Sequence, residues 1–162
     1  MYTLHYTRKL LDRAKVAPAA SSPPPTTVLG NWYATALFWK PQVALLVNER
    51  TLLPVLMPLA PASTLASRFP TELAAVLRGH GASQAFIAGE VAAMSEVTVA
   101  KTSNRSVLGT INEFAFLAEA YREGVELLAL SMRLADTPCG ALKHDYPQRL
   151  IREIVGADAQ WH

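Results

Sequence analysis

The chain has 162 residues, enough to bury about two thirds of its unfolded surface as one domain, and we treat residues 1–162 as a single domain. A hydrophobic fraction of 51% with only 17% charged residues excludes a largely disordered chain. The formal net charge of +2 gives no support to nucleic-acid binding.

The N-terminal region predicts one strand, one helix and a loop. Residues 2–6 alternate apolar and polar side chains, which favours a short strand. Residues 8–15 carry a short apolar stripe and predict a helix. Residues 16–27 predict a Pro-rich loop, because proline fixes φ and lacks an N–H donor. The N-terminus has no basic segment followed by an apolar run, so we expect no signal peptide.

Three further strands follow in close succession. Residues 32–39 are aromatic and β-branched, residues 42–47 form a continuous apolar run, and residues 51–57 return after a turn. Their connections are too short for a crossover, so they predict an antiparallel meander. Pro54 cannot donate to a sheet ladder and predicts an edge or a bulge for the last strand. The apolar run at 42–47 predicts a strand buried on both faces.

The second half is mainly helical. Amphipathic patterns predict helices at residues 71–79 and 87–94, followed by a strand at 96–100. A long helix then extends to about residue 123, starting either at a Thr110–Glu113 capping box or with Ser106 as its cap.

The last two segments follow a glycine stop at residue 124. Residues 125–135 favour a helix, with a strand as the alternative. A last helix opens at Pro147 and ends at Gly156. The predicted fold is therefore α+β, with an antiparallel meander sheet and helices packed mainly on one face. The 96–100 strand is expected to join this sheet, and the 2–6 strand is a further candidate to join it.

Three motifs resemble a family of small uncharacterised proteins of bacteria and archaea, known as a domain of unknown function. They are Leu-Gly-Asn-Trp-Tyr-Ala at 29–34, Val-Asn-Glu-Arg-Thr-Leu at 47–52 and Lys-Thr-Ser-Asn-Arg-Ser-Val-Leu-Gly at 101–109. The resemblance covers most of the chain, with the Pro-rich stretch at 21–25 as an insertion. It implies a single domain and carries no activity.

The loop at residues 101–106 is the strongest candidate for a binding site. It places Lys101, Asn104, Arg105 and Ser106 at the start of the long helix, where backbone N–H groups and basic side chains favour an anion. The Gly-x4-Gly-Lys-Ser/Thr spacing of a P-loop is missing, so nucleotide hydrolysis has no support. The competing interpretation is structural: Asn104 and Ser106 satisfy the loop backbone while Arg105 pairs with an acid such as Glu113.

Glu49, at the tip of the meander, is a second candidate site residue. We expect a small cytoplasmic binding or regulatory protein that recognises an anionic small molecule or a macromolecular partner through the 101–106 loop. The alternatives are a small acid–base enzyme using Glu49 with Arg105, and a pure protein-interaction module. The single cysteine and four scattered histidines predict no metal site, and no motif implies a cofactor.

Two expectations concern the surroundings of the chain. Its apolar runs are far shorter than the ~20 residues that span a bilayer, so we expect no membrane partner. The high apolar content and the aromatic strand at 32–39 predict a homodimer.

Overall fold

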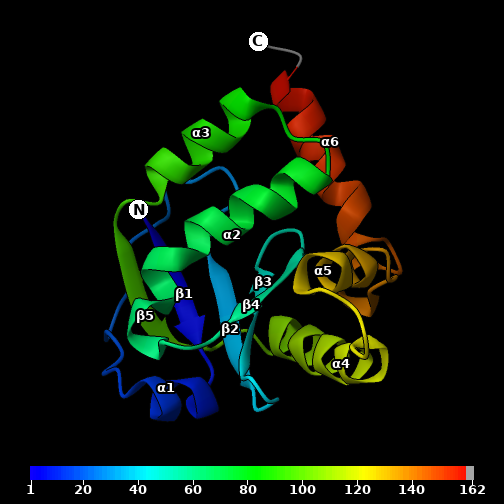
Figure 1. The fold of residues 1–162 in the computed structure, drawn as a ribbon. Helices are drawn as coiled ribbons and strands as arrows, with labels where there is room; N and C mark the ends of the chain where they lie inside the picture. Colours follow the sequence, from blue (N-terminus) through cyan, green and yellow to red (C-terminus); the bar gives the residue numbers. More distant parts are fainter. Residues whose placement is uncertain (160–162) are drawn as a thin grey trace.

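We describe the fold from a computed structural model, which describes the backbone of residues 1–159 and the side chains through residue 156 (Figure 1). The strands are β1 (Tyr2–Tyr6), β2 (Trp32–Leu37), β3 (Val43–Asn48), β4 (Pro54–Pro58) and β5 (Val97–Lys101). The helices are α1 (Arg8–Ala14), α2 (Leu65–Gly79), α3 (Gln84–Ala93), α4 (Arg105–Tyr121), α5 (Leu127–Ala135) and α6 (Pro147–Ala159). Short 3-10 turns occupy Ala62–Thr64 and Gly140–Leu142.

Within this described part, the strands form one sheet in the order β4-β3-β2-β1-β5. The pairs β2–β3 and β3–β4 are antiparallel, which confirms the meander, and β3 is internal as its apolar run predicts. The α+β class is confirmed, but the sheet is mixed, because β1 pairs in parallel with both β2 and β5. The long connection at residues 7–31 contains α1 and the Pro-rich segment, and it allows this parallel return.

Helices cover both faces of the sheet, with the larger share on one. Trp32 and Ala34 of β2 face a core shared with α1, α2, α3 and α6, where the Trp32 and Phe69 rings meet edge to face at 5.0 Å. Tyr33 and Leu37 face a second core formed with α4 and α5. Figure 1 shows α4 and α5 side by side, and α2, α3 and α6 grouped above the sheet.

Both outer strands have part of their open edge covered. The amide of Leu56 in β4 donates to the hydroxyl of Ser131 in α5, which in turn donates to the Leu127 carbonyl. On the opposite edge, the amide of Ala19 donates to the Val99 carbonyl of β5 at 2.8 Å. Pro54 lies in the edge strand β4, as its missing N–H predicts.

Several helix boundaries differ from the sequence prediction, including the start of α3, which lies at Gln84. Helix α4 starts earlier than either predicted cap: Asn104 is the N-cap, and its side chain accepts from the amides of Ser106 and Val107. Helix α2 starts at Leu65 and continues through Pro70, which lies past the first turn and cannot donate the usual hydrogen bond to the carbonyl four residues earlier. Helix α6 continues past Gly156 to Ala159, since an isolated glycine lowers helix stability by only ~1 kcal/mol. The segment at 125–135 is helical, in agreement with its propensity.

The family-like motifs at 29–34 and 47–52 are joined by the buried side chain of Asn48. Its Nδ2 donates to the carbonyls of Leu29 and Asn31, at 2.9 and 3.2 Å. Its Oδ1 accepts from the amides of Arg50 and Thr51 and from the Thr51 hydroxyl. One fully buried amide therefore satisfies the backbone of two separate segments.

His80 lies buried at the end of α2, and neither ring nitrogen has a hydrogen-bond partner among the residues that the structure describes. Burial is the main cause, and the nearby positive charge of Arg152 a smaller one, of a His80 pKa lowered to about 4 from an ordinary value of 6.5. The folded protein therefore keeps this imidazole neutral under conditions in which the unfolded chain protonates it.

No helix in residues 1–159 is both long and apolar enough to cross a membrane. Of the aromatic residues that predicted a dimer, Trp32 and Tyr33 are buried within the chain's own two cores, whereas Phe38 is exposed. The oligomeric state remains a prediction.

Replacing Asn48 with alanine is expected to lower the free energy of unfolding by about 2–4 kcal/mol, because it leaves several buried backbone groups without partners. Urea denaturation of wild type and variant measures this loss. The control is Asn112→Ala, an exposed position on α4 that should change stability by less than about 0.5 kcal/mol. Equal stability of the two variants would contradict the role assigned to Asn48.

The His80 environment predicts an acid-dependent loss of stability. A histidine with a depressed folded-state pKa makes the protein lose stability as pH falls from about 6.5 to about 4, by roughly 3 kcal/mol in total. His80→Leu should remove this part of the pH dependence, whereas His144→Asn, at an exposed position, should leave it intact. Unfolding curves at several pH values measure the difference, and parallel curves for wild type and His80→Leu would contradict it.

Candidate functional site

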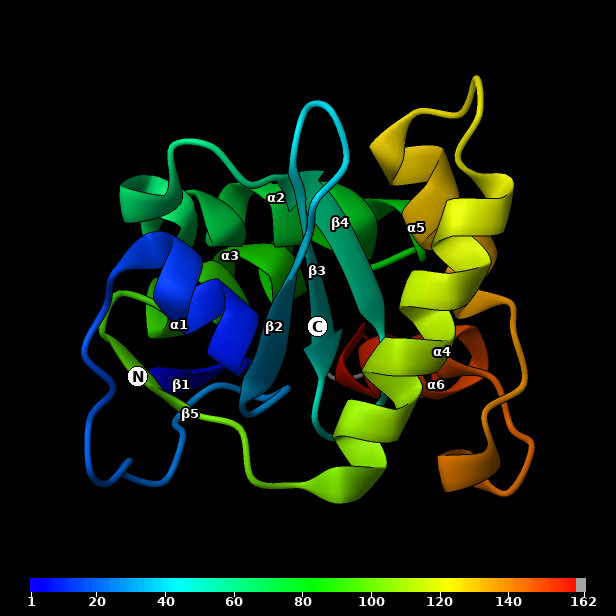
Figure 2. The same ribbon diagram turned by 90° about the horizontal axis from the view of Figure 1, so that it is seen from below.

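The carboxyl ends of β1 and β5 lie side by side, because these strands are parallel neighbours with Tyr6 opposite Lys101. After β1 the chain enters α1 on one face of the sheet, and after β5 it enters α4 on the other. Figure 2 shows the short loop that leads from β5 into α4. In sheets with parallel strands, such a divergence opens a crevice at the carboxyl ends, where ligands commonly bind.

A cavity of about 640 Å³ occupies this position. Its walls are His5, residues 18–22 of the Pro-rich segment, and residues 100–103 at the end of β5. Ala100 lies opposite His5 in the sheet register, and His5 itself is largely buried, with 9% of its surface exposed. The Pro-rich segment supplies two exposed hydroxyls, Ser21 and Ser22, and the loop supplies Thr102 and Ser103.

The imidazole of His5 is held in a defined orientation. Its Nδ1 lies 2.8 Å from the carbonyl oxygen of Lys101. Because a carbonyl only accepts, Nδ1 carries the proton, and in the neutral ring Nε2 is then an acceptor. The ring also stacks on Tyr33 with centroids 4.6 Å apart. Nε2 has no partner among the described residues, so His5 brings a free acceptor to the cavity wall.

Tyr33 fixes the other end of the loop. Its hydroxyl accepts the backbone N–H of Asn104 at 3.1 Å, and the Asn104 side chain then caps α4. The Leu108 amide donates to the Asn104 carbonyl, so the N-terminus of α4 is largely satisfied within the chain. An anion would therefore depend more on side chains than on free backbone amides.

The candidate residues from the sequence lie in different settings. Lys101 is exposed and lines the cavity. Arg105 and Ser106 are exposed in the first turn of α4, next to the cavity walls in sequence but outside them. Asn104 acts as the helix cap. Glu49 is exposed in the β3–β4 turn, and no described hydrogen bond, ion pair or cavity joins it to the loop.

The positive charges of this loop remain unpaired. Within residues 1–156, neither Lys101 nor Arg105 forms an ion pair, and the pairing of Arg105 with Glu113 that the structural interpretation required does not occur there. The other half of that interpretation holds for Asn104, whose side chain does satisfy the backbone. The same part of the chain holds no cluster of three or more potential metal ligands.

Sequence reasoning missed the residues that shape this site. His5 was considered only as a possible metal ligand, and Tyr33 only as part of an aromatic strand. The available signal was local: His5 is a polar residue in a strand whose neighbours are aromatic. Its partner Lys101 is 96 positions away, and only the parallel pairing of β1 with β5 brings the two together.

The fold and cavity define a small α+β domain with a polar crevice at the carboxyl ends of two parallel strands. The model of a family described as a domain of unknown function, DUF6933, matches residues 3–150, and the chain belongs to this family. The match includes the Pro-rich segment and all strands except the first residue of β1. No curated protein and no solved structure matches the chain.

Tyr33→Phe is expected to loosen the loop without disturbing the core. The variant removes only the hydroxyl that accepts the Asn104 amide, so the free energy of unfolding should fall by about 1 kcal/mol. Hydrogen exchange should accelerate at the Asn104 amide more than in β3. Tyr146→Phe, at an exposed ring, is the matched control. Unchanged exchange at Asn104 would contradict the role assigned to the Tyr33 hydroxyl.

Proposed function

We propose that this chain is a small cytoplasmic binding or regulatory protein that holds an anionic ligand at the crevice between the 101–106 loop and the Pro-rich segment. The observation that carries the proposal is the cavity of about 640 Å³ at the carboxyl ends of β1 and β5. Lys101 lies on its wall with Arg105 two residues beyond Ser103 of that wall, and neither forms an ion pair with another residue of 1–156. Unpaired basic side chains beside a cavity favour phosphate or carboxylate groups.

The ligand would meet complementary hydrogen-bonding groups. Hydroxyls of Ser21, Ser22 and Ser103 can donate to anionic oxygens. The oriented Nε2 of His5 can accept a hydrogen bond from a hydroxyl group on the ligand. These features favour an anion that also carries a hydroxyl, such as a phosphate monoester or monohydrogen phosphate.

The alternatives receive less support from the geometry. An acid–base enzyme that uses Glu49 with Arg105 needs both groups at one substrate, yet they lie in separate surroundings. A pure interaction module needs one large apolar patch. The large exposed apolar side chains instead belong to different elements: Val28, Phe38, Val97, Phe116, Leu128 and Tyr146. Dimerisation stays a separate prediction, to be measured by light scattering.

Phosphate is expected to raise the melting temperature of the wild type. The free energy of unfolding should increase by RT ln(1 + [L]/Kd), or about 1.4 kcal/mol at a phosphate concentration of ten times Kd. Lys101→Ala and Arg105→Ala should each reduce this stabilisation. Lys9→Ala removes an exposed cation of α1 that lines none of the described cavities, and it should respond as the wild type does. Sodium chloride at matched ionic strength controls for screening.

A pair of substitutions at His5 separates ligand binding from loop support. His5→Asn keeps an N–H close to the position of Nδ1 but removes Nε2, so it should retain stability and lose part of the phosphate response. His5→Gln should keep the phosphate response and lose stability, because it weakens the contact with the Lys101 carbonyl.

If phosphate stabilises the Lys101 and Arg105 variants as much as the wild type, the loop is not the binding site.

A further inference from the structure

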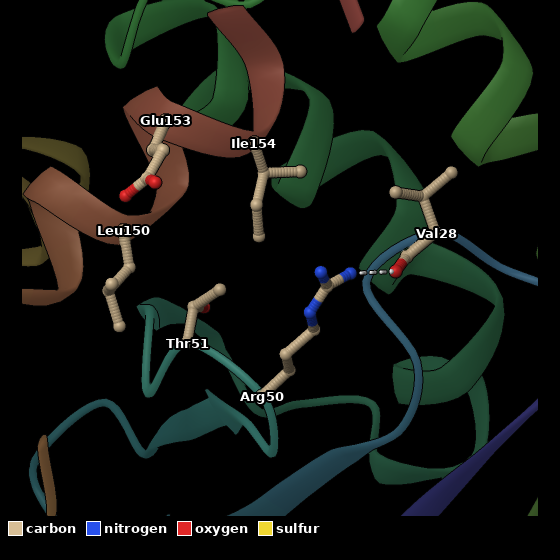
Figure 3. Close-up of a pocket in the computed structure, with 6 residues that line it drawn as sticks. All are labelled: Val28, Arg50, Thr51, Leu150, Glu153 and Ile154. Atoms are coloured by element: carbon tan, nitrogen blue, oxygen red, sulfur yellow. Dashed lines mark hydrogen bonds between the residues drawn. The ribbon is translucent and has the colours of Figure 1, made fainter. Parts of the chain in front are cut away.

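A second cavity, of about 450 Å³, lies between the β3–β4 turn, the segment before β2, and α6 (Figure 3). Its walls are Val28, Arg50, Thr51, Leu150, Glu153 and Ile154. None of these residues lines the crevice at the carboxyl ends of β1 and β5. The cavity is therefore a separate candidate with chemistry of its own.

Arg50 is positioned by contacts at both its backbone and its side chain. Its amide donates to Asn48 Oδ1 at 3.1 Å, and its Nη1 donates to the Val28 carbonyl at 3.0 Å. The Val28 amide in turn donates to the buried carboxylate of Glu90 at 2.8 Å, which anchors the segment that orients the guanidinium. Figure 3 shows this guanidinium reaching between Thr51 and Val28 toward Ile154.

The guanidinium has binding capacity left. Of its five N–H groups, one is used by the Val28 carbonyl, and Arg50 forms no ion pair within residues 1–156. A planar group with adjacent free N–H donors matches the two oxygens of a carboxylate.

The rest of the cavity wall is mainly apolar. Val28 is 49% exposed, and Leu150 and Ile154 are half-buried, with their side chains directed toward the cavity in Figure 3. Apolar surface that remains in contact with water is a source of binding free energy for an apolar ligand. An aliphatic or aromatic group would cover these three side chains together.

Glu153 places a negative charge on the α6 wall of the cavity. Its carboxylate lies on the α6 wall and is 3.3 Å from Nη1 of Arg149, one turn earlier on the same helix. Because this ion pair is exposed to solvent, Arg149 neutralises the negative charge of Glu153 only in part. We expect this carboxylate to disfavour a dianion such as phosphate more than a ligand with a single negative charge.

We propose that this cavity binds a small apolar monocarboxylate, with the carboxylate on Arg50 and the hydrocarbon part against Val28, Leu150 and Ile154. The site is separate from the crevice at the 101–106 loop. It favours an apolar monoanion over a phosphate, because its walls are mainly apolar and one of them carries a carboxylate.

The test is calorimetric titration of the whole chain with acetate, butyrate and hexanoate. Affinity should increase about three- to fourfold for each methylene that becomes buried. Arg50→Gln should bind hexanoate at least tenfold more weakly, while Arg8→Gln, at an exposed arginine of α1, should bind as the wild type does. Glu153→Gln should bind hexanoate more tightly, because a like charge is removed.

The Glu153→Gln variant distinguishes ligand binding by Arg50 from a purely structural role of Arg50. A structural arginine predicts no gain from Glu153→Gln. Affinity that does not depend on chain length, equal hexanoate binding by wild type and Arg50→Gln, or no gain in Glu153→Gln each overturns the proposal. Arg50→Gln should leave the response to phosphate unchanged, so this test and the test of the 101–106 loop can fail separately.

Discussion

The strand β1 pairs in parallel with β2 on one side and with β5 on the other, and most of the arrangement depends on these two pairings. They join the meander to the second half of the chain, because β5 has no other partner strand in the described sheet. They also bring His5 beside the carbonyl of Lys101. A register slip of one residue would move His5 to the opposite face and place Tyr6 at the crevice. The same pairings therefore define both the sheet and the candidate site.

Much of the fold could be predicted from local patterns. The apolar run of β3 and the short connections around it predicted a central antiparallel strand, and Pro54 predicted an edge. The parallel position of β1 was not predictable in this way, because residues 7–31 separate it from β2 and give no register. The predicted start of α4 was wrong because Thr110 and Glu113 also fit a capping pattern. In the structure Asn104 is the N-cap, and its side chain accepts two backbone hydrogen bonds.

The candidate site was predictable only where its residues are consecutive. Lys101 and Arg105 were found because a basic loop before a helix is a local feature. His5, Ser21 and Ser22 join them only through the three-dimensional structure, and no spacing in the sequence indicates their proximity. The role of Asn48 shows the same limit: a turn motif indicated a hairpin tip, but its partners at Leu29 and Asn31 lie on a different segment.

The Pro-rich segment both lines the crevice and covers the edge of β5, through the bond from the Ala19 amide to the Val99 carbonyl. An uncovered strand edge is a template on which other chains can add strands and form aggregates. A ligand that contacts residues 18–22 favours the docked state of this segment by mass action. If the proposed ligand binds, its supply would influence how often the β5 edge is open, and an empty crevice would favour aggregation during storage or overexpression.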